Sequence, residues 1–109
     1  MYFLKVNDVL AALQIIATHH RAQFTYPVIG ITGSNGKTIV KEWLNQLLSN
    51  RYQIIRSPRS YNSQIGVPLS VWEMEENRQL AIFEAGISQK GEMDVLANII
   101  QPTIGILTS

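Results

Sequence analysis

A glycine-rich stretch of seven residues, Thr32-Gly33-Ser34-Asn35-Gly36-Lys37-Thr38, constrains the fold more than any other part of the sequence. It follows a short apolar run over residues 26–31 and precedes an amphipathic stretch over residues 39–48. The sequence therefore predicts a buried strand, a tight turn and a helix in succession. Gly33 and Gly36 can adopt backbone angles that are closed to residues with side chains, so this turn can wrap closely around a ligand.

The residue types in this turn are those that bind phosphate. Peptide N–H groups of such a turn can point inward together and surround an anion, and the helix behind them adds the positive end of its dipole. Lys37 would place a positive charge on the outer phosphates, and the Thr38 hydroxyl could reach Mg²⁺. The turn is therefore interpreted as a phosphate-binding P-loop, to which Ser34, Asn35 and the two glycines contribute backbone amides.

The general P-loop pattern, Gly-x4-Gly-Lys-[Ser/Thr], would place a glycine at position 31, where this chain has Ile31. Gly30 comes one residue too early for that pattern, and Gly33 is an additional glycine inside it. An ordinary glycine turn with a surface lysine is the alternative interpretation. The strand before the turn and the helix after it favour the P-loop.

Composition excludes several classes of protein. The 109 residues, 46% of them hydrophobic, allow one domain at most. A net charge of +1 argues against a nucleic-acid-binding surface, and the absence of cysteine excludes disulfides and thiolate metal sites. There is no apolar run of about 18 residues that could span a membrane, and no signal-peptide pattern. We therefore expect a cytoplasmic protein.

Strand and helix patterns alternate along the rest of the chain, which indicates an α/β fold with a parallel sheet and flanking helices. The expected elements are a helix within residues 1–24, strands at 27–31, 52–55, 79–84 and 103–107, and helices over 39–48, from 66 and from 92. In the helix after the P-loop, the residues expected to be buried are Ile39, Val40, Trp43, Leu44, Leu47 and Leu48. Those expected to face water are Lys41, Glu42, Asn45 and Gln46.

Polar residues follow the ends of two expected strands, which is where open α/β sheets bind ligands. Glu84 ends the third strand and is the candidate that would hold Mg²⁺ together with Thr38. The alternative for Glu84 is a helix-capping or surface glutamate. Arg56 and Arg59 lie in the loop after the second strand, where they either meet an anionic substrate or are ordinary solvated charges.

Four segments, in the right order, resemble the Mur ligase family. Residues 32–38 are similar to its ATP loop, Thr-Gly-[Thr/Ser]-[Asn/Lys]-Gly-Lys-[Thr/Ser], which does not need a glycine at position 31. Residues 62–68 resemble its Asn-[Asn/Thr]-x-Ile-Gly-x-Pro stretch, and residues 83–93 resemble its Glu-x-Gly…Gly-Glu-[Ile/Met] segment. Residues 104–109 resemble the strand before its His-containing loop.

The resemblance implies the central ATPase domain, truncated at Ser109: residues 25–109 would be its N-terminal part, and residues 1–24 a leading helix or linker. It implies that ATP phosphorylates a carboxylate and that an amine attacks the acyl phosphate to form an amide. Lys37 would be the catalytic residue in this chain, and Thr38 and Glu84 would hold Mg²⁺ with help from Asn62 and its neighbour. That neighbour is serine, where the family more usually has Asn or Thr.

Within the family, the Ile-Gly-Val-Pro-Leu run most resembles the members that add D-alanyl-D-alanine to a UDP-N-acetylmuramoyl tripeptide in peptidoglycan synthesis. Some bacteria fuse such a ligase to an alanine racemase, and this segment would suit that arrangement. The chain by itself is expected not to ligate. Two other functions stay open, a P-loop kinase or NTPase of another class and a non-catalytic nucleotide-binding module. A natural small nucleotide-binding protein is the alternative to a fragment, and no pattern indicates an oligomeric state.

Overall fold

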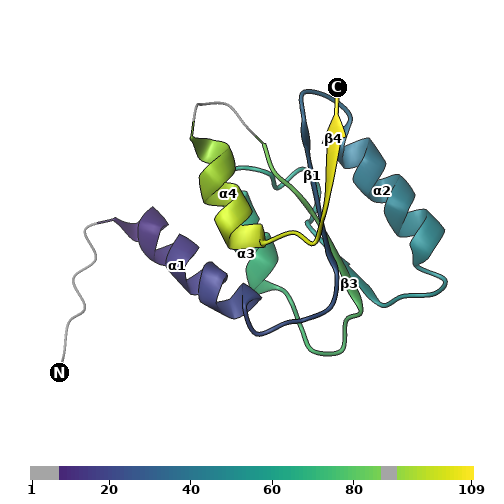
Figure 1. Cartoon of the computed structure of the whole chain (residues 1–109), viewed down its shortest axis with the longest axis horizontal. Coiled ribbons are helices and arrows are strands. Elements are labelled where there is room, and N and C mark those ends of the chain that lie inside the picture. The colour runs from purple at the N-terminus through teal and green to yellow at the C-terminus, as the bar shows by residue number, and fades with distance from the viewer. Residues whose placement is uncertain (1–7, 87–90) are drawn as a thin grey trace.

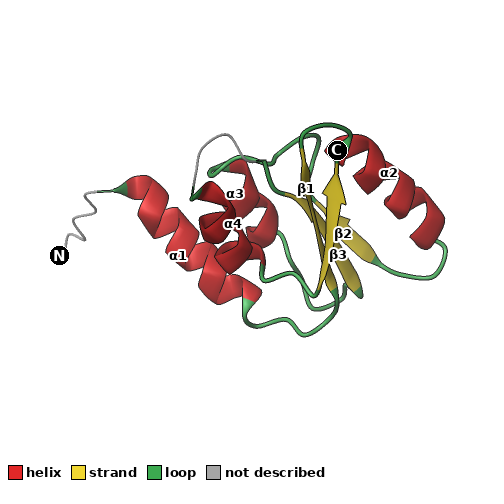
Figure 2. Ribbon diagram, turned by 45° about the horizontal axis from the view of Figure 1, so that its top comes forward, coloured by secondary structure: helices red, strands yellow, loops and turns green. Residues whose placement is uncertain are grey.

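The computed structural model describes residues 8–86 and 91–109 and shows a four-stranded parallel sheet between two layers of helices (Figures 1 and 2). The elements in chain order are α1 Val9–Arg21, β1 Val28–Gly33, α2 Lys37–Leu48, β2 Ile54–Arg56, α3 Gly66–Trp72, β3 Leu80–Glu84, α4 Glu92–Ile100 and β4 Ile104–Thr108. The predicted α/β fold is confirmed. Among the described residues, no helix is both long and apolar enough to cross a membrane.

The strands lie in the order β2-β3-β1-β4, and every pair is parallel. All five residues of β3 are buried, as are Val28, Ile29 and Ile31 of β1. The apolar runs that form β1 and β3 are therefore covered on both faces of the sheet, whereas β4 is largely exposed. Because the strands are parallel, their carboxyl ends meet at one edge of the sheet, where Ile31 lies opposite Glu84.

The two helical layers divide the core between them. Helices α3 and α4 lie on one face of the sheet, α1 packs against these two helices, and α2 covers the other face (Figure 1). Alternate residues of the strands supply the two sides: Val28 and Phe83 belong to the cluster under the three helices, whereas Ile29 and Ile82 belong to the cluster under α2. This arrangement places the start of α2 directly over the carboxyl ends of β1 and β3.

Helix α1 is packed into this core through its second half. Ala17 is fully buried, and the guanidinium of Arg21 donates hydrogen bonds to the carbonyls of Ile100, Gln101 and Phe24 at 2.6, 2.7 and 2.9 Å. These bonds satisfy a buried cation with backbone acceptors and fasten the end of α1 to the end of α4.

The prediction for the faces of α2 was wrong in part. Val40, Leu44 and Leu48 do pack on the sheet, but the exposed fractions of Ile39, Trp43 and Leu47 are 55, 62 and 74%. Lys41, expected in water, is completely buried. Apolar residues occupy more than one face of this helix, so hydrophobicity alone did not determine its rotation. The P-loop turns the face that carries Thr38 and Lys41 toward the sheet.

Candidate functional site

The P-loop joins the carboxyl end of β1 to the start of α2. β1 ends at Gly33, whose φ is 133°, and the helix begins at Lys37 after Gly36, whose φ is 80°. Both angles lie in the region that favours glycine. No side chain at Gly36 accepts a hydrogen bond from the first-turn amides of α2, so a bound anion can take that place.

Replacing the two glycines of the loop is expected to lower the free energy of unfolding by different amounts. A Cβ at Gly33 would lie 2.1 Å from the carbonyl oxygen of Thr108, whereas a Cβ at Gly36 meets nothing within 4 Å. We expect Gly33→Ala to lower the free energy of unfolding by about 2–3 kcal/mol, through strain and the clash together. Gly36→Ala, the matched control, should cost about 1 kcal/mol. Urea unfolding followed by circular dichroism tests this, and equal losses for the two variants would contradict it.

A pocket of about 280 Å³ opens at the P-loop. Its lining residues are Ser34, Asn35, Gly36, Lys37, Thr38, Ile39, Asn62 and Glu84. The pocket lining thus includes all the predicted site residues except Gly33. The Gly33 carbonyl accepts a hydrogen bond from Lys37 Nζ at 2.8 Å. Ser63 does not line the pocket; its Oγ accepts a hydrogen bond from the Gly66 amide at the start of α3, at 3.0 Å.

Glu84 and Thr38 meet at the base of this pocket, as predicted. The Thr38 hydroxyl lies 3.0 Å from both carboxylate oxygens of Glu84, so its single proton is shared between them. The Asn62 side-chain amide donates to Glu84 Oε1 at 3.4 Å. The interpretation of Glu84 as a surface residue is wrong, because it is fully buried.

The oxygen donors at this point suit Mg²⁺. Carboxylate and hydroxyl oxygens are ligands that this ion prefers, usually together with water and substrate phosphates. The parts of the chain that the structure describes contain no group of three His, Cys, Asp or Glu residues that could hold a metal by themselves. A Mg²⁺ ion here would therefore take its remaining ligands from water and from a bound phosphate.

Sequence reasoning missed one charged residue of the site. Lys41 Nζ lies 2.8 Å from Glu84 Oε2, and neither side chain is exposed. The same ammonium donates to the carbonyl of Ser57 at 2.7 Å and to the carbonyl of Arg59. A signal was present, because Lys41 follows Thr38 by one helical turn and so shares its face.

Arg56, the last residue of β2, and Arg59, in the loop after it, are both exposed. Arg56 pairs with Glu42 of α2, with Nε and Nη2 donating at 2.9 and 3.1 Å. The hydrogen bond from Arg56 holds the pKa of the Glu42 carboxyl below its usual value. Arg59 contributes its carbonyl to Lys41 and has a φ of 49°. These contacts make the loop after β2 part of the support behind the P-loop.

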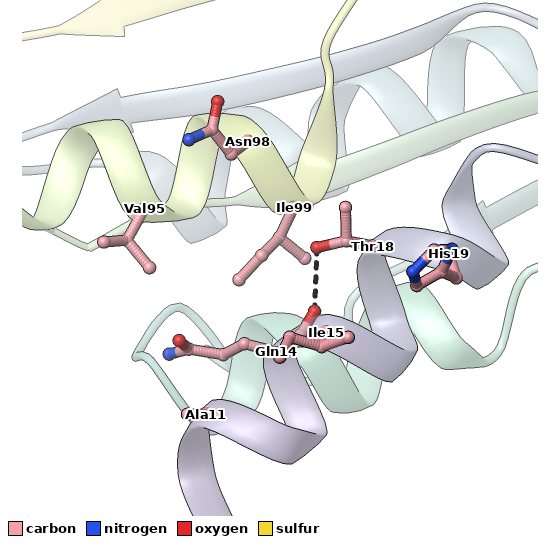
Figure 3. Close-up of a pocket in the computed structure, with 8 residues that line it drawn as sticks. All are labelled: Ala11, Gln14, Ile15, Thr18, His19, Val95, Asn98 and Ile99. Carbon is pink, nitrogen blue, oxygen red and sulfur yellow. Dashed lines mark hydrogen bonds between the residues drawn. The ribbon is translucent and has the colours of Figure 1, made fainter.

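Another pocket lies between α1 and α4, away from the P-loop (Figure 3). Its lining residues are Ala11, Gln14, Ile15, Thr18, His19, Val95, Asn98 and Ile99. The Thr18 hydroxyl in it donates to the Gln14 carbonyl of its own helix at 2.7 Å (Figure 3). None of the lining residues is an acid, a lysine or an arginine, so the P-loop pocket is the better candidate for phosphate chemistry.

Comparison with known proteins identifies the family of this chain. Residues 31–109 match the family described as Mur ligase middle domain. The UDP-N-acetylmuramoyl-tripeptide--D-alanyl-D-alanine ligase of Borreliella burgdorferi is 41% identical over 109 residues, which are 100% of this chain and 24% of that ligase. A crystal structure of MurF from Acinetobacter baumannii has a TM-score of 0.90 at 33% identity, covering 95% of this chain and 23% of that chain.

A second solved structure is a complex with a nucleotide. The MurF ligase from Thermotoga maritima in complex with ADP has a TM-score of 0.86 at 30% identity, covering 95% of this chain and 24% of that chain. The chain thus spans about a quarter of the length of the relatives that it matches. The family match extends over most of the chain and includes the P-loop, Asn62 and Glu84. The chain belongs to the Mur ligase family.

Proposed function

We propose that this chain supplies the ATP-binding P-loop segment of an amide ligase that adds D-alanyl-D-alanine to a UDP-N-acetylmuramoyl tripeptide during peptidoglycan precursor synthesis. The observation that carries the proposal is the Thr38 hydroxyl 3.0 Å from both oxygens of the Glu84 carboxylate, at the base of the P-loop pocket. The relatives' names supply the substrates, and the ADP-bound relative supports nucleotide binding. In this proposal residues 25–109 are the N-terminal part of the ATP-binding domain, residues 1–24 lead into it, and the enzyme works in the cytoplasm.

The proposed chemistry assigns a role to each pocket residue. The amides of Gly33, Ser34, Asn35 and Gly36 would hold the nucleotide phosphates. Lys37 would exchange the Gly33 carbonyl for a phosphate oxygen and stabilise the charge that develops as the terminal phosphoryl group moves to the tripeptide carboxylate.

Thr38 and Glu84 would hold Mg²⁺, with Asn62 supporting the carboxylate. The ion would supply charge neutralisation between the phosphates. The amine of D-alanyl-D-alanine then attacks the acyl phosphate, which forms the amide and releases phosphate. Other parts of such a ligase would bind the amine and the UDP-sugar.

The test replaces the matching quarter of the Borreliella burgdorferi ligase with this chain and assays the chimera with ATP, Mg²⁺ and both substrates. We expect amide formation, and a hydroxamate when hydroxylamine replaces D-alanyl-D-alanine, because hydroxylamine traps an acyl phosphate. ATP hydrolysis without hydroxamate would favour an NTPase, and ADP binding without turnover would favour a binding module. The 109-residue chain alone is the control and should bind Mg·ADP without forming amide.

A further inference from the structure

Lys41 occupies a closed, polar position behind the P-loop pocket. Its ammonium group has three N–H donors, and three acceptors surround it: Glu84 Oε2 at 2.8 Å, the Ser57 carbonyl at 2.7 Å and the Arg59 carbonyl. The side chain is completely buried, and it is not part of the lining of the P-loop pocket. Lys41 therefore does not reach a phosphate in that pocket, and its contacts hold it in one place.

The contacts of Lys41 also determine how the Glu84 carboxylate faces the pocket. Oε2 is taken by Lys41, whereas Oε1 has only the longer contact of 3.4 Å from the Asn62 amide besides the shared Thr38 proton. Glu84 still lines the pocket. The carboxylate thus has one oxygen held by Lys41 and another oxygen with weaker contacts, which leaves the second oxygen more able to accept a new partner.

We propose that Lys41 is a positioning residue for the divalent cation that accompanies the nucleotide. It fixes one oxygen of Glu84 so that the other faces the cation next to the Thr38 hydroxyl, and it ties the backbone of residues 57–59 to the same point. Mg²⁺ requires a near-ideal octahedral geometry, so its affinity depends on how firmly a ligand carboxylate is oriented. This inference rests on the proposed nucleotide-binding function.

The test compares the affinity of the chain for ADP with and without Mg²⁺, by isothermal titration calorimetry. In the native chain we expect Mg²⁺ to tighten ADP binding. We call the ratio of ADP affinity with Mg²⁺ to ADP affinity without it the gain from Mg²⁺. Lys41→Met keeps the volume and removes the charge, and it should lower this gain about tenfold or more, as is typical when a partner of a metal ligand is removed. Affinity for ADP without Mg²⁺ should change by less than about threefold, because the loop amides and Lys37 are intact.

Arg51→Met is the matched control, since it removes one positive charge from an exposed residue in the turn that follows α2. It should leave both affinities unchanged. A merely structural role for Lys41 would weaken ADP binding equally with and without Mg²⁺. A gain from Mg²⁺ that stays the same, or increases, in Lys41→Met would overturn the proposal.

If Lys41→Met does not fold, Lys41→Arg replaces it in the same comparison. The wider guanidinium head cannot use the same three contacts in the closed space, so it should displace the carboxylate and lower the gain from Mg²⁺. An unchanged gain in Lys41→Arg would overturn the positioning role while leaving nucleotide binding established. No ADP binding by the native chain, with or without Mg²⁺, would overturn both this inference and the proposed function.

Discussion

Replacing Lys37 with alanine is expected to slow ATP-dependent amide formation by the chimeric ligase about 10²–10³-fold, the usual effect of removing one donor that stabilises charge in the transition state. Lys37 lines the P-loop pocket, and its ammonium lies 2.8 Å from the Gly33 carbonyl. The amine therefore has a polar partner when the pocket holds no phosphate, and it can move to a phosphate oxygen when one binds. The rate of amide formation at saturating substrates is the measurement.

The control for this prediction separates a catalytic loss from a loss of folding. Lys37→Ala removes one partly exposed hydrogen bond, so the free energy of unfolding should fall by only about 1 kcal/mol. Arg51→Ala removes an exposed positive charge elsewhere and should leave the rate unchanged. A Lys37→Ala chimera that kept the native rate would contradict the proposed role of the P-loop.

The phosphate pocket could be predicted because its elements are neighbours in sequence. The loop, the strand before it and the helix after it are consecutive, and the glycines at 33 and 36 have the backbone angles for which glycine was expected. Glu84 could be predicted as well, because parallel strands that each end in a polar residue bring those ends to one edge of the sheet. Its contact with Thr38 needed only that β1 and β3 be adjacent, which the structure confirms.

The burial of Lys41 could not be predicted by the same reasoning. It depends on the strand order. β2 must lie beside β3 before the carbonyls of Ser57 and Arg59 can surround the same ammonium group as the Glu84 carboxylate. Alternating strands and helices do not specify that order. A lysine in an amphipathic helix is normally exposed, and only the convergence of three acceptors makes this position favourable. The expectation that Trp43 is in the core fails for a related reason. Trp43 belongs to an apolar stripe of the helix, but the P-loop turns that stripe toward solvent.

The pair of Lys41 and Glu84 leads to the largest expected effect on stability. Neither side chain is exposed, so removing one charge leaves the other buried without its partner. Glu84→Gln should lower the free energy of unfolding by about 3–5 kcal/mol, and Lys41→Met by a similar amount. Because small domains have only about 5–15 kcal/mol in total, either variant should unfold at a much lower urea concentration than the native chain.

The double variant Lys41→Met/Glu84→Gln distinguishes a buried ion pair from two independent contacts. When both charges are absent no buried charge is left unpaired, so the double variant should lose clearly less stability than the sum of the single losses. Glu75→Gln is the matched control, because the Glu75–Arg78 pair lies at the surface, does not involve Lys41 or Glu84 and should contribute less than about 1 kcal/mol. Additive losses in the double variant would show that Lys41 and Glu84 do not depend on each other, and the carboxylate would then have to be oriented by Thr38 and Asn62 alone.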